Sequence, residues 1–331
     1  MDEHVLEVAS HVSSSVLNGD LIWVLGAGVN LCGRPSGSGW RDTGAGRFLP
    51  DAGELGAYLA DINGPVFRGR EHRLRDLARV SQYTMLALGS RDLYDSLHKI
   101  FDADYGPTAV HVFLASLPSL LRSRARENWG QLLVTTNYDD VLEKAFRARG
   151  EEFDLVTYIA QTKDENSGKF YHLKPTGERC VIQDPNEYTD LPEAHSGSLI
   201  VKMHGTVRRG APESDLDQYV ITEDDYVDYL TRADVSQLFP VTLAARLKNS
   251  HLLFLGYGLR DWNVRVMLNR LWKQSKLVKN SWAVYPNPDR TDRAFWGSKG
   301  VEIVDAKLED FIPQLSSQLD ARLKALPATA S

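Results

Sequence analysis

The sequence is poor in cysteine. Among its 331 residues it has only Cys32 and Cys180, and neither belongs to a CxxC pair. A disulfide framework or a cysteine-rich zinc site needs more cysteines at closer spacing. We therefore expect a protein of a reducing compartment that has no zinc module and no other metal site.

Positive charge and long apolar runs are scarce as well. The net charge is −6, which argues against general affinity for nucleic acid or anionic membranes. The first residues, MDEHVLEVAS, lack the basic start and apolar run of a signal peptide, and no stretch has the length of a membrane span. In the arginine-rich stretch 68–79, leucines at helical spacing favour a solvated helix face over a nucleic-acid or partner patch. We expect a soluble cytoplasmic protein without direct contact to nucleic acid or membrane.

The N-terminal third of the sequence contains helices, one strand and a long loop. A helical stripe over residues 5–17 precedes a short apolar strand at 21–25. Residues 33–50 are rich in Gly, Pro and Ser, which predicts a long mobile loop. Segments within 51–105 have the three-to-four residue apolar spacing of helices and little strand character. We interpret this stretch as a helical insertion, or subdomain, within a larger domain.

Strands and helices alternate along the rest of the chain. Apolar strands separated by amphipathic helices favour a mainly parallel sheet with helices on both faces. A polar excursion at 161–198 predicts one short hairpin, and the last residues, 326–331, read as a disordered tail. The sequence thus predicts a single Rossmann-like α/β domain over residues 1–331. Ligands of such sheets bind beyond the carboxyl ends of the strands.

A glycine-rich turn follows the first strand. Gly26 and Gly28 occupy the first two glycine positions of a phosphate-binding turn, but Leu31 stands at the third. A tight structural turn would need the same two glycines. Because the third glycine is absent, the short side chain of Asn30 has room to face a ligand.

The stretch TTNYDD follows a second strand. Its Asn137 and Asp139 are separated by one residue. Capping of the next helix explains one such residue, whereas an amide and a carboxylate together could recognise a carboxamide such as that of nicotinamide. Both interpretations remain open at this point.

Two further stretches also follow strands. His204 comes after an apolar run and is followed by a glycine, so it is either a structural histidine or a side chain suited to proton transfer. In FLGYGLRDWN, Gly256 permits close backbone approach and Asp261 could reach ribose hydroxyls, although a loop and a capped helix would have the same pattern.

Taken together, GAGVN, TTNYD, KMHG and FLGYGLRDWN resemble the SIR2-like domain, in the branch found in bacterial antiviral defence proteins. The resemblance spans roughly residues 18–305. Two features depart from protein-deacylating sirtuins: Asn30 replaces the usual Ser, and the two CxxC pairs that hold a structural zinc are absent. The helical stretch is expected to fill the space of that zinc module.

The resemblance implies an NAD⁺ hydrolase (NADase), with NAD⁺ as substrate and no metal. Such an enzyme cleaves the nicotinamide–ribose bond and releases nicotinamide and ADP-ribose. Carried over to this sequence, Asn137 would hold the nicotinamide amide or the attacking water, Asp139 would fix the carboxamide, and His204 would act as general base. The resemblance also implies a set of substrate-binding residues: Gly26, Ala27, Gly28 and Asn30 on the diphosphate, Gly256 and Asp261 on the adenosine half, and Thr136 and Tyr257 beside them.

The resemblance further implies a role in anti-phage defence by abortive infection, through depletion of NAD⁺. We expect a homo-oligomer that is activated by a partner protein in trans, with a HerA-type ATPase as the leading candidate and a short Argonaute-type protein as the second. Two alternatives are an NAD⁺-dependent protein deacylase or ADP-ribosyltransferase, and a noncatalytic sensor of NAD⁺ or ADP-ribose.

Overall fold

The structure is a computed structural model of the chain. It describes residues 3–40, 48–64, 76–123, 129–160, 165–192, 197–209, 219–231, 240–257 and 279–325. The predicted tail at 326–331, most of the stretch 68–79 and the candidate Asp261 lie outside the described residues.

A nine-stranded sheet with the order β5-β4-β3-β6-β2-β1-β7-β8-β9 runs through the described chain. The strands from β3 to β9 in this order pair in parallel, and β4 and β5 add an antiparallel hairpin at one edge. The predicted α/β fold with a mainly parallel sheet is confirmed. The strands are β1 (Leu21–Leu25), β2 (Gly130–Thr135), β3 (Phe153–Tyr158), β4 (Phe170–Leu173), β5 (Arg179–Ile182), β6 (Gly197–Lys202), β7 (His251–Leu255), β8 (Ser281–Val284) and β9 (Val301–Val304).

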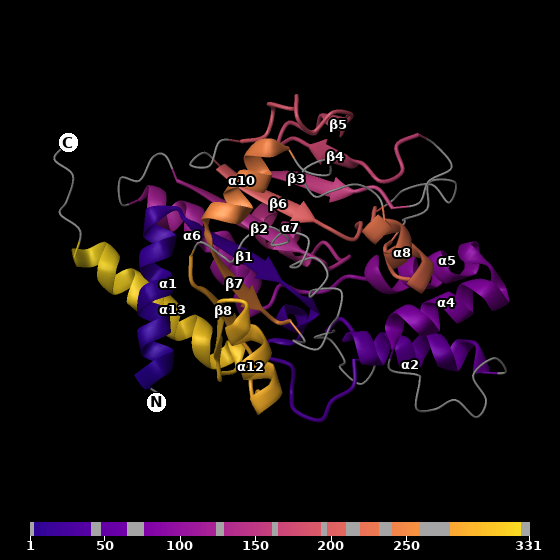
Figure 1. Ribbon diagram of the computed structural model, residues 1–331, viewed down its shortest axis with the longest axis horizontal. Coiled ribbons are helices and arrows are strands. Elements are labelled where there is room, and N and C mark those ends of the chain that lie inside the picture. The colour runs from indigo at the N-terminus through magenta and orange to yellow at the C-terminus, as the bar shows by residue number, and fades with distance from the viewer. Residues whose placement is uncertain are drawn as a thin grey trace.

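Helices cover both faces of this sheet (Figure 1). Successive strand residues point to opposite faces, so that Trp23 belongs to one core and Ile22 to the other. Both faces are buried, which is why the central strands are mainly apolar. One core packs against α1 (Glu3–Asn18), α6 (Ala109–Arg122), α7 (Val141–Ala148) and α13 (Leu308–Ala325), and the other against α8 (Glu223–Thr231), α10 (Val241–Asn249) and α12 (Arg290–Ser298).

Three helices form a helical block on the side toward which the parallel strands point (Figure 1). They are α2 (Ala52–Ile62), α4 (Leu77–Leu88) and α5 (Ser90–Phe101), as the apolar spacing predicted. Asp51 and Asp76 cap α2 and α4 through their side chains. The block has a core of its own, which also receives Tyr138 and Tyr219 from the sheet side. That residues 51–105 are a subdomain within one domain stays a prediction.

One detail differs from the sequence-based expectation: helix α12 was missed, although Asp289 and Asp292 form a capping box at its start. The predicted loop at 33–50 has no helix or strand among its described residues, and Arg34 in it forms an ion pair with Glu54 of α2. That this loop is mobile stays a prediction. Within the described ranges, no helix is both long and apolar enough to cross a membrane.

Candidate active site

A cavity of about 840 Å³ lies at the carboxyl ends of the central strands. Strand β1 has β2 on one side and β7 on the other, and such a switch point is where α/β sheets bind ligands. A volume of this size suits a cofactor-sized molecule. The predicted site residues that line it are Ala27, Gly28, Asn30, Thr136, Asn137, Asp139, His204, Gly256 and Tyr257.

The two glycine turns contact each other at the base of the cavity. The amide of Gly28 donates to the carbonyl of Gly256 (2.8 Å), and the amide of Gly26 donates to the carbonyl of Leu255 (3.0 Å). Gly256 has a φ of +68°, and a Cβ atom placed on it would lie 2.3 Å from the amide nitrogen of Val29. These glycines are therefore required by backbone–backbone contact between the turns after β1 and β7.

Asn137 is held against the first of these turns. Its Nδ2 donates to the carbonyl of Gly26 (3.2 Å), and its backbone amide donates to Oγ1 of Thr135 (3.0 Å). The Thr135 hydroxyl in turn donates to the carbonyl of Leu25 (2.9 Å). These bonds tie the end of β2 to the end of β1, so that Asn137 has a defined position in the wall of the cavity.

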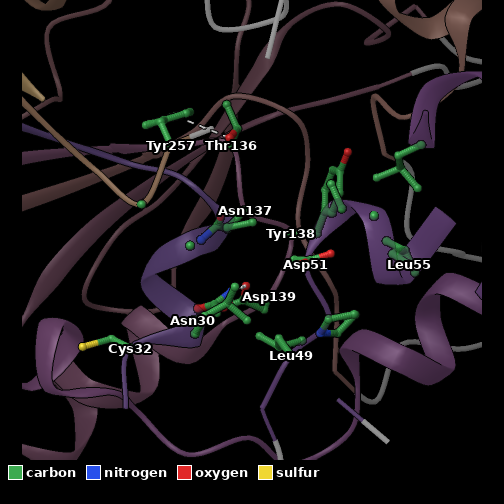
Figure 2. A pocket seen from close by; sticks show the side chains of 18 of the residues that line it. Asn30, Cys32, Leu49, Asp51, Leu55, Thr136, Asn137, Tyr138, Asp139 and Tyr257 are labelled. Atoms are coloured by element: carbon green, nitrogen blue, oxygen red, sulfur yellow. Dashed lines mark hydrogen bonds between the residues drawn. The ribbon is translucent and has the colours of Figure 1, made fainter. Parts of the chain in front are cut away.

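Asp139 links the second motif to the first. Its Oδ2 accepts a hydrogen bond from Nδ2 of Asn30 (2.8 Å), and its Oδ1 accepts one from the amide of Val141 at the start of α7 (3.1 Å). Figure 2 shows Asn30 and Asp139 side by side in the cavity wall. The bond to the Val141 amide fits the capping interpretation of the TTNYDD stretch, and recognition of a carboxamide stays a prediction.

His204 completes the group of polar residues. Its ring lies 5.5 Å from that of Tyr226 and 5.6 Å from that of Tyr229, measured between centroids, and both tyrosines belong to α8. Only 4% of His204 is exposed, and burial lowers its pKa from 6.5 to about 3. The imidazole is therefore neutral at physiological pH, and a neutral imidazole can accept a hydrogen bond or a proton.

A buried ion pair, which the sequence analysis missed, supports the loop that carries Asn137 and Asp139. Lys202 is fully buried at the end of β6, and its Nζ lies 3.0 Å from Oε1 of Glu143. The same Nζ donates to the backbone carbonyls of Tyr138 and Asp139. The sequence does contain a signal for this ion pair: Lys202 directly follows the apolar residues 199–201 of a predicted strand. A lysine in such a buried position needs an acidic partner.

Arg209 fastens the other side of this loop to the helical block. Its guanidinium bonds both carboxylate oxygens of Asp140 (2.5 and 2.7 Å) and donates to the carbonyls of Asp102 and Ala103 after α5. The pairing with Arg209 lowers the pKa of Asp140, although partial burial opposes this shift. The guanidinium therefore connects the loop that carries Asn137 and Asp139 to the end of α5.

The helical block supplies the apolar wall of the cavity. Leu49, Leu55, Leu77 and Phe101 line this side, and Figure 2 shows Leu55 across the cavity from Asn137. The end of β8 and the start of α13 close a further side of the cavity. These lining residues were not predicted, since apolar residues in helices have the same pattern whether they fill a core or face a ligand. Within the described ranges, no three His, Cys, Asp or Glu side chains are grouped as metal ligands.

The fold and the cavity define a Rossmann-like α/β protein with a ligand-sized site at the switch point of its sheet. A sequence model of the SIR2-like domain family matches residues 131–304, which is more than half of the chain. The chain belongs to the SIR2-like family, and the resemblance predicted from the four motifs is confirmed.

Two curated relatives are similar to the chain. Defense-associated sirtuin 2 of Bacillus subtilis is 24% identical over 316 residues, which cover 92% of the chain and 25% of the relative. NAD(+) hydrolase ThsA of Acinetobacter baumannii (strain 532279) is 28% identical over 165 residues, which cover 50% of the chain and 24% of the relative. The chain thus spans about a quarter of the length of these relatives.

Proposed function

We propose that the chain is an NAD⁺ hydrolase that releases nicotinamide and ADP-ribose. The observation that carries the proposal is the convergence of Asn137 and His204, which are far apart in the sequence, on one cavity at the switch point of the sheet. The relative named as an NAD(+) hydrolase supports the same reaction. Asp139 and Asn30 add a polar group that a nucleotide with a carboxamide can use.

The reaction needs a leaving group and a water molecule in fixed positions. The bond from ribose C1′ to the nicotinamide nitrogen breaks with its electron pair on nicotinamide, a water oxygen bonds to C1′, and one proton is released. Positive charge builds on the ribose as the bond breaks, so oriented polar groups lower the barrier. Asn137 orients the nicotinamide or the water, and neutral His204 accepts a hydrogen bond from a ribose hydroxyl or from the water.

The glycine turn holds the diphosphate. The amide of Gly26 donates to Leu255 at the end of β7 and the amide of Gly28 donates to Gly256 in the turn after it, so these two donors are already used within the protein. We assign the Ala27 amide, at the start of the short helix Ala27–Leu31, to the phosphates. Thr136, Gly256 and Tyr257 bind the nucleotide beside this turn. Asp261, which lies outside the described residues, remains a proposal for the adenosine half.

The direct test follows nicotinamide release from NAD⁺ by chromatography. We expect Asn137→Ala and His204→Ala each to lower kcat/KM by about a hundredfold to a thousandfold, in line with the loss of a transition-state contact. The exposed Asn186→Ala and His11→Ala serve as matched controls and keep wild-type turnover. Wild-type rates in both site variants would refute the assignment.

The same assay tests the defence role and its alternatives. We propose that the activity depletes NAD⁺ during phage infection and depends on a partner in trans, so it is measured alone, with a HerA-type ATPase and with a short Argonaute-type protein. Release that requires an acylated peptide would show a deacylase, and transfer of ADP-ribose to protein would show a transferase. Tight NAD⁺ binding without turnover under every condition would show a sensor.

A further inference from the structure

The imidazole of His204 is oriented by packing against other rings. Within the described ranges, no hydrogen bond reaches its ring nitrogens. Its edge-to-face contacts with Tyr226 and Tyr229 therefore set the orientation of the ring. Both tyrosines are buried and belong to α8, so the position of His204 depends on how this short helix is held.

The start of α8 is capped by a side chain from another helix. The backbone amide of Asp224 donates to Oε1 of Gln82 on α4 (3.0 Å), and Nε2 of Gln82 donates to Oδ2 of Asp224 (2.8 Å). The first amides of a helix have no partner within the helix, so a side chain that accepts from one of them stabilises the helix start. Such a cap normally comes from the residues just before the helix, whereas Gln82 lies 142 positions earlier. The same side chain thus caps α8 and ties it to the helical block.

Gln82 is the buried polar contact between α4 and α8, which lie beside each other in Figure 1. Its side chain belongs to a residue that is only 7% exposed. The ion pair between the same helices joins Arg79 to Glu223, whose side chains are 39% and 45% exposed, and such a pair contributes little. Thr222 caps the amide of Asp225 (3.0 Å), but this bond ties α8 only to its own preceding residue. Gln82 is therefore the contact best placed to fix α8 against the block.

We propose that Gln82 is a positioning residue for His204. From α4 it fixes the start of α8, and the tyrosines of α8 then hold the imidazole in the wall of the cavity. Gln82 does not line the cavity, so it acts through α8 and not on the substrate. The inference rests on the proposed function, because His204 is the base of that reaction. It gives the helical block a part in catalysis in addition to its apolar wall.

The test exchanges the hydrogen-bonding groups of the two partners. Gln82→Met keeps a side chain of similar length but removes both hydrogen bonds, and Gln82→Glu places a second carboxylate against that of Asp224. Adding Asp224→Asn to Gln82→Glu restores both bonds, because the new side-chain amide and the backbone amide of residue 224 both donate to the new carboxylate. A misplaced base slows the chemical step more than it weakens binding. We therefore expect kcat to fall about tenfold in each single variant, with KM within about twofold of the wild-type value, and to recover in the double variant.

A spectroscopic measurement follows the ring without any reaction. The ring protons of His204 lie beside two aromatic rings, so their NMR signal, assigned by its loss in His204→Ala, depends on this packing. We expect the signal to move in both single variants and to return in the double variant. It comes from folded molecules alone, so partial unfolding does not move it. Gln131→Met is the matched control, because Gln131 is also buried but bonds Leu114 and Ser198 near the amino ends of the strands, and it keeps the wild-type signal and kcat.

Each outcome decides between the proposals. A kcat that stays at the wild-type value in Gln82→Met overturns the inference and leaves NAD⁺ hydrolysis intact. Equal losses in Gln82→Met and Gln131→Met, or no recovery in the double variant, show a general effect on stability and also overturn it. If the wild-type protein releases no nicotinamide with or without the candidate partners, the proposed function fails and the NMR signal alone decides. Movement in Gln82→Met with return in the double variant then supports the positioning of the ring, and a signal that stays in place overturns it.

Discussion

The cavity has two walls of different construction. The strand-end wall is made of loops after parallel strands, and it is held by hydrogen bonds to backbone groups and by the buried pair of Lys202 and Glu143. The block wall is made of capped helices with their own apolar core around Leu97, and it presents mainly apolar side chains to the cavity. The strand-end wall holds the polar side chains of the cavity in place, whereas the block wall determines how much space is left for a substrate.

We expect the two walls to respond differently to single substitutions. Backbone hydrogen bonds and buried charges depend on exact partners, so a single substitution leaves a polar group unpaired. An apolar helical wall loses packing in proportion to the volume removed. We therefore expect substitutions in the strand-end wall to have larger effects, and the predictions below test this comparison in order of decreasing effect.

The largest expected effect is that of Lys202→Met, in the strand-end wall. It leaves Glu143 buried without its partner, and burial already raises the pKa of Glu143, so we expect a loss of about 3–5 kcal/mol in unfolding free energy by urea titration. The double variant Lys202→Met with Glu143→Leu regains most of this stability, because neither charge remains. Lys144→Met, on α7 next to Glu143, costs less than about 1 kcal/mol, because its nearer partner Asp104 is exposed and Asp140, 3.8 Å away, keeps its bonds to Arg209. Equal effects of the two lysine variants would contradict the account.

A core substitution tests the block wall. Leu97 is fully buried on α5, and Leu97→Ala is expected to cost about 2–4 kcal/mol through the lost contacts and the cavity that remains. In amide hydrogen exchange, α2, α4 and α5 should lose protection while β1 and β2 keep theirs, because the block has a separate core. Equal loss of protection in the sheet would show that the two walls unfold together and would remove the basis for a subdomain at 51–105.

The buried histidine makes the strand-end wall sensitive to acid. Burial lowers the pKa of His204 from 6.5 to about 3, so below pH 6.5 the unfolded chain takes up a proton that the folded chain does not. Its contribution to stability falls by about 1.4 kcal/mol per pH unit between pH 6 and 4. We expect the pH slope of unfolding free energy to be smaller by this amount in His204→Gln than in the wild type, with their difference at pH 8 as the baseline. Parallel slopes for the two proteins would show that His204 is not buried as described.

The smallest expected effect concerns the start of α2. Oδ1 of Asp51 accepts a hydrogen bond from the backbone amide of Glu54, and Oε2 of Glu54 accepts one from the backbone amide of Asp51. Asp51→Ala removes this cap, and we expect it to lower the unfolding free energy by about 1 kcal/mol in a thermal or urea melt. A loss as large as that of Lys202→Met would mean that the block wall depends on exact polar partners as much as the strand-end wall does.

The sequence predicted the strand-end wall far better than the block wall. GAGVN, TTNYD and KMHG are short and polar at the ends of apolar strands, so strand topology alone brings Asn30, Asn137 and His204 to one edge of the sheet. The partners of these residues were not predictable, because the bond between Asn30 and Asp139 spans 109 positions. The hydrogen bond between Gly28 and Gly256 was not predictable either, because the two residues are far apart in the sequence. In addition, the glycines of each motif also fit a phosphate-binding turn.

The helices of the block were predicted from their spacing, but their place against the cavity was not. Leu55 and Phe101 have the same apolar periodicity as core residues such as Leu59, and only the three-dimensional arrangement shows that the first two line the cavity. Helix α12 was missed because its apolar face is small, with Trp296 as the one buried aromatic in the described helix.

The most direct test of the account is a crystal structure of the His204→Ala variant with NAD⁺. The account predicts that the nicotinamide-bearing ribose lies between Asn137 and position 204. A dinucleotide bound outside this cavity, or inside it with the nicotinamide directed away from Asn137, would contradict the central claim.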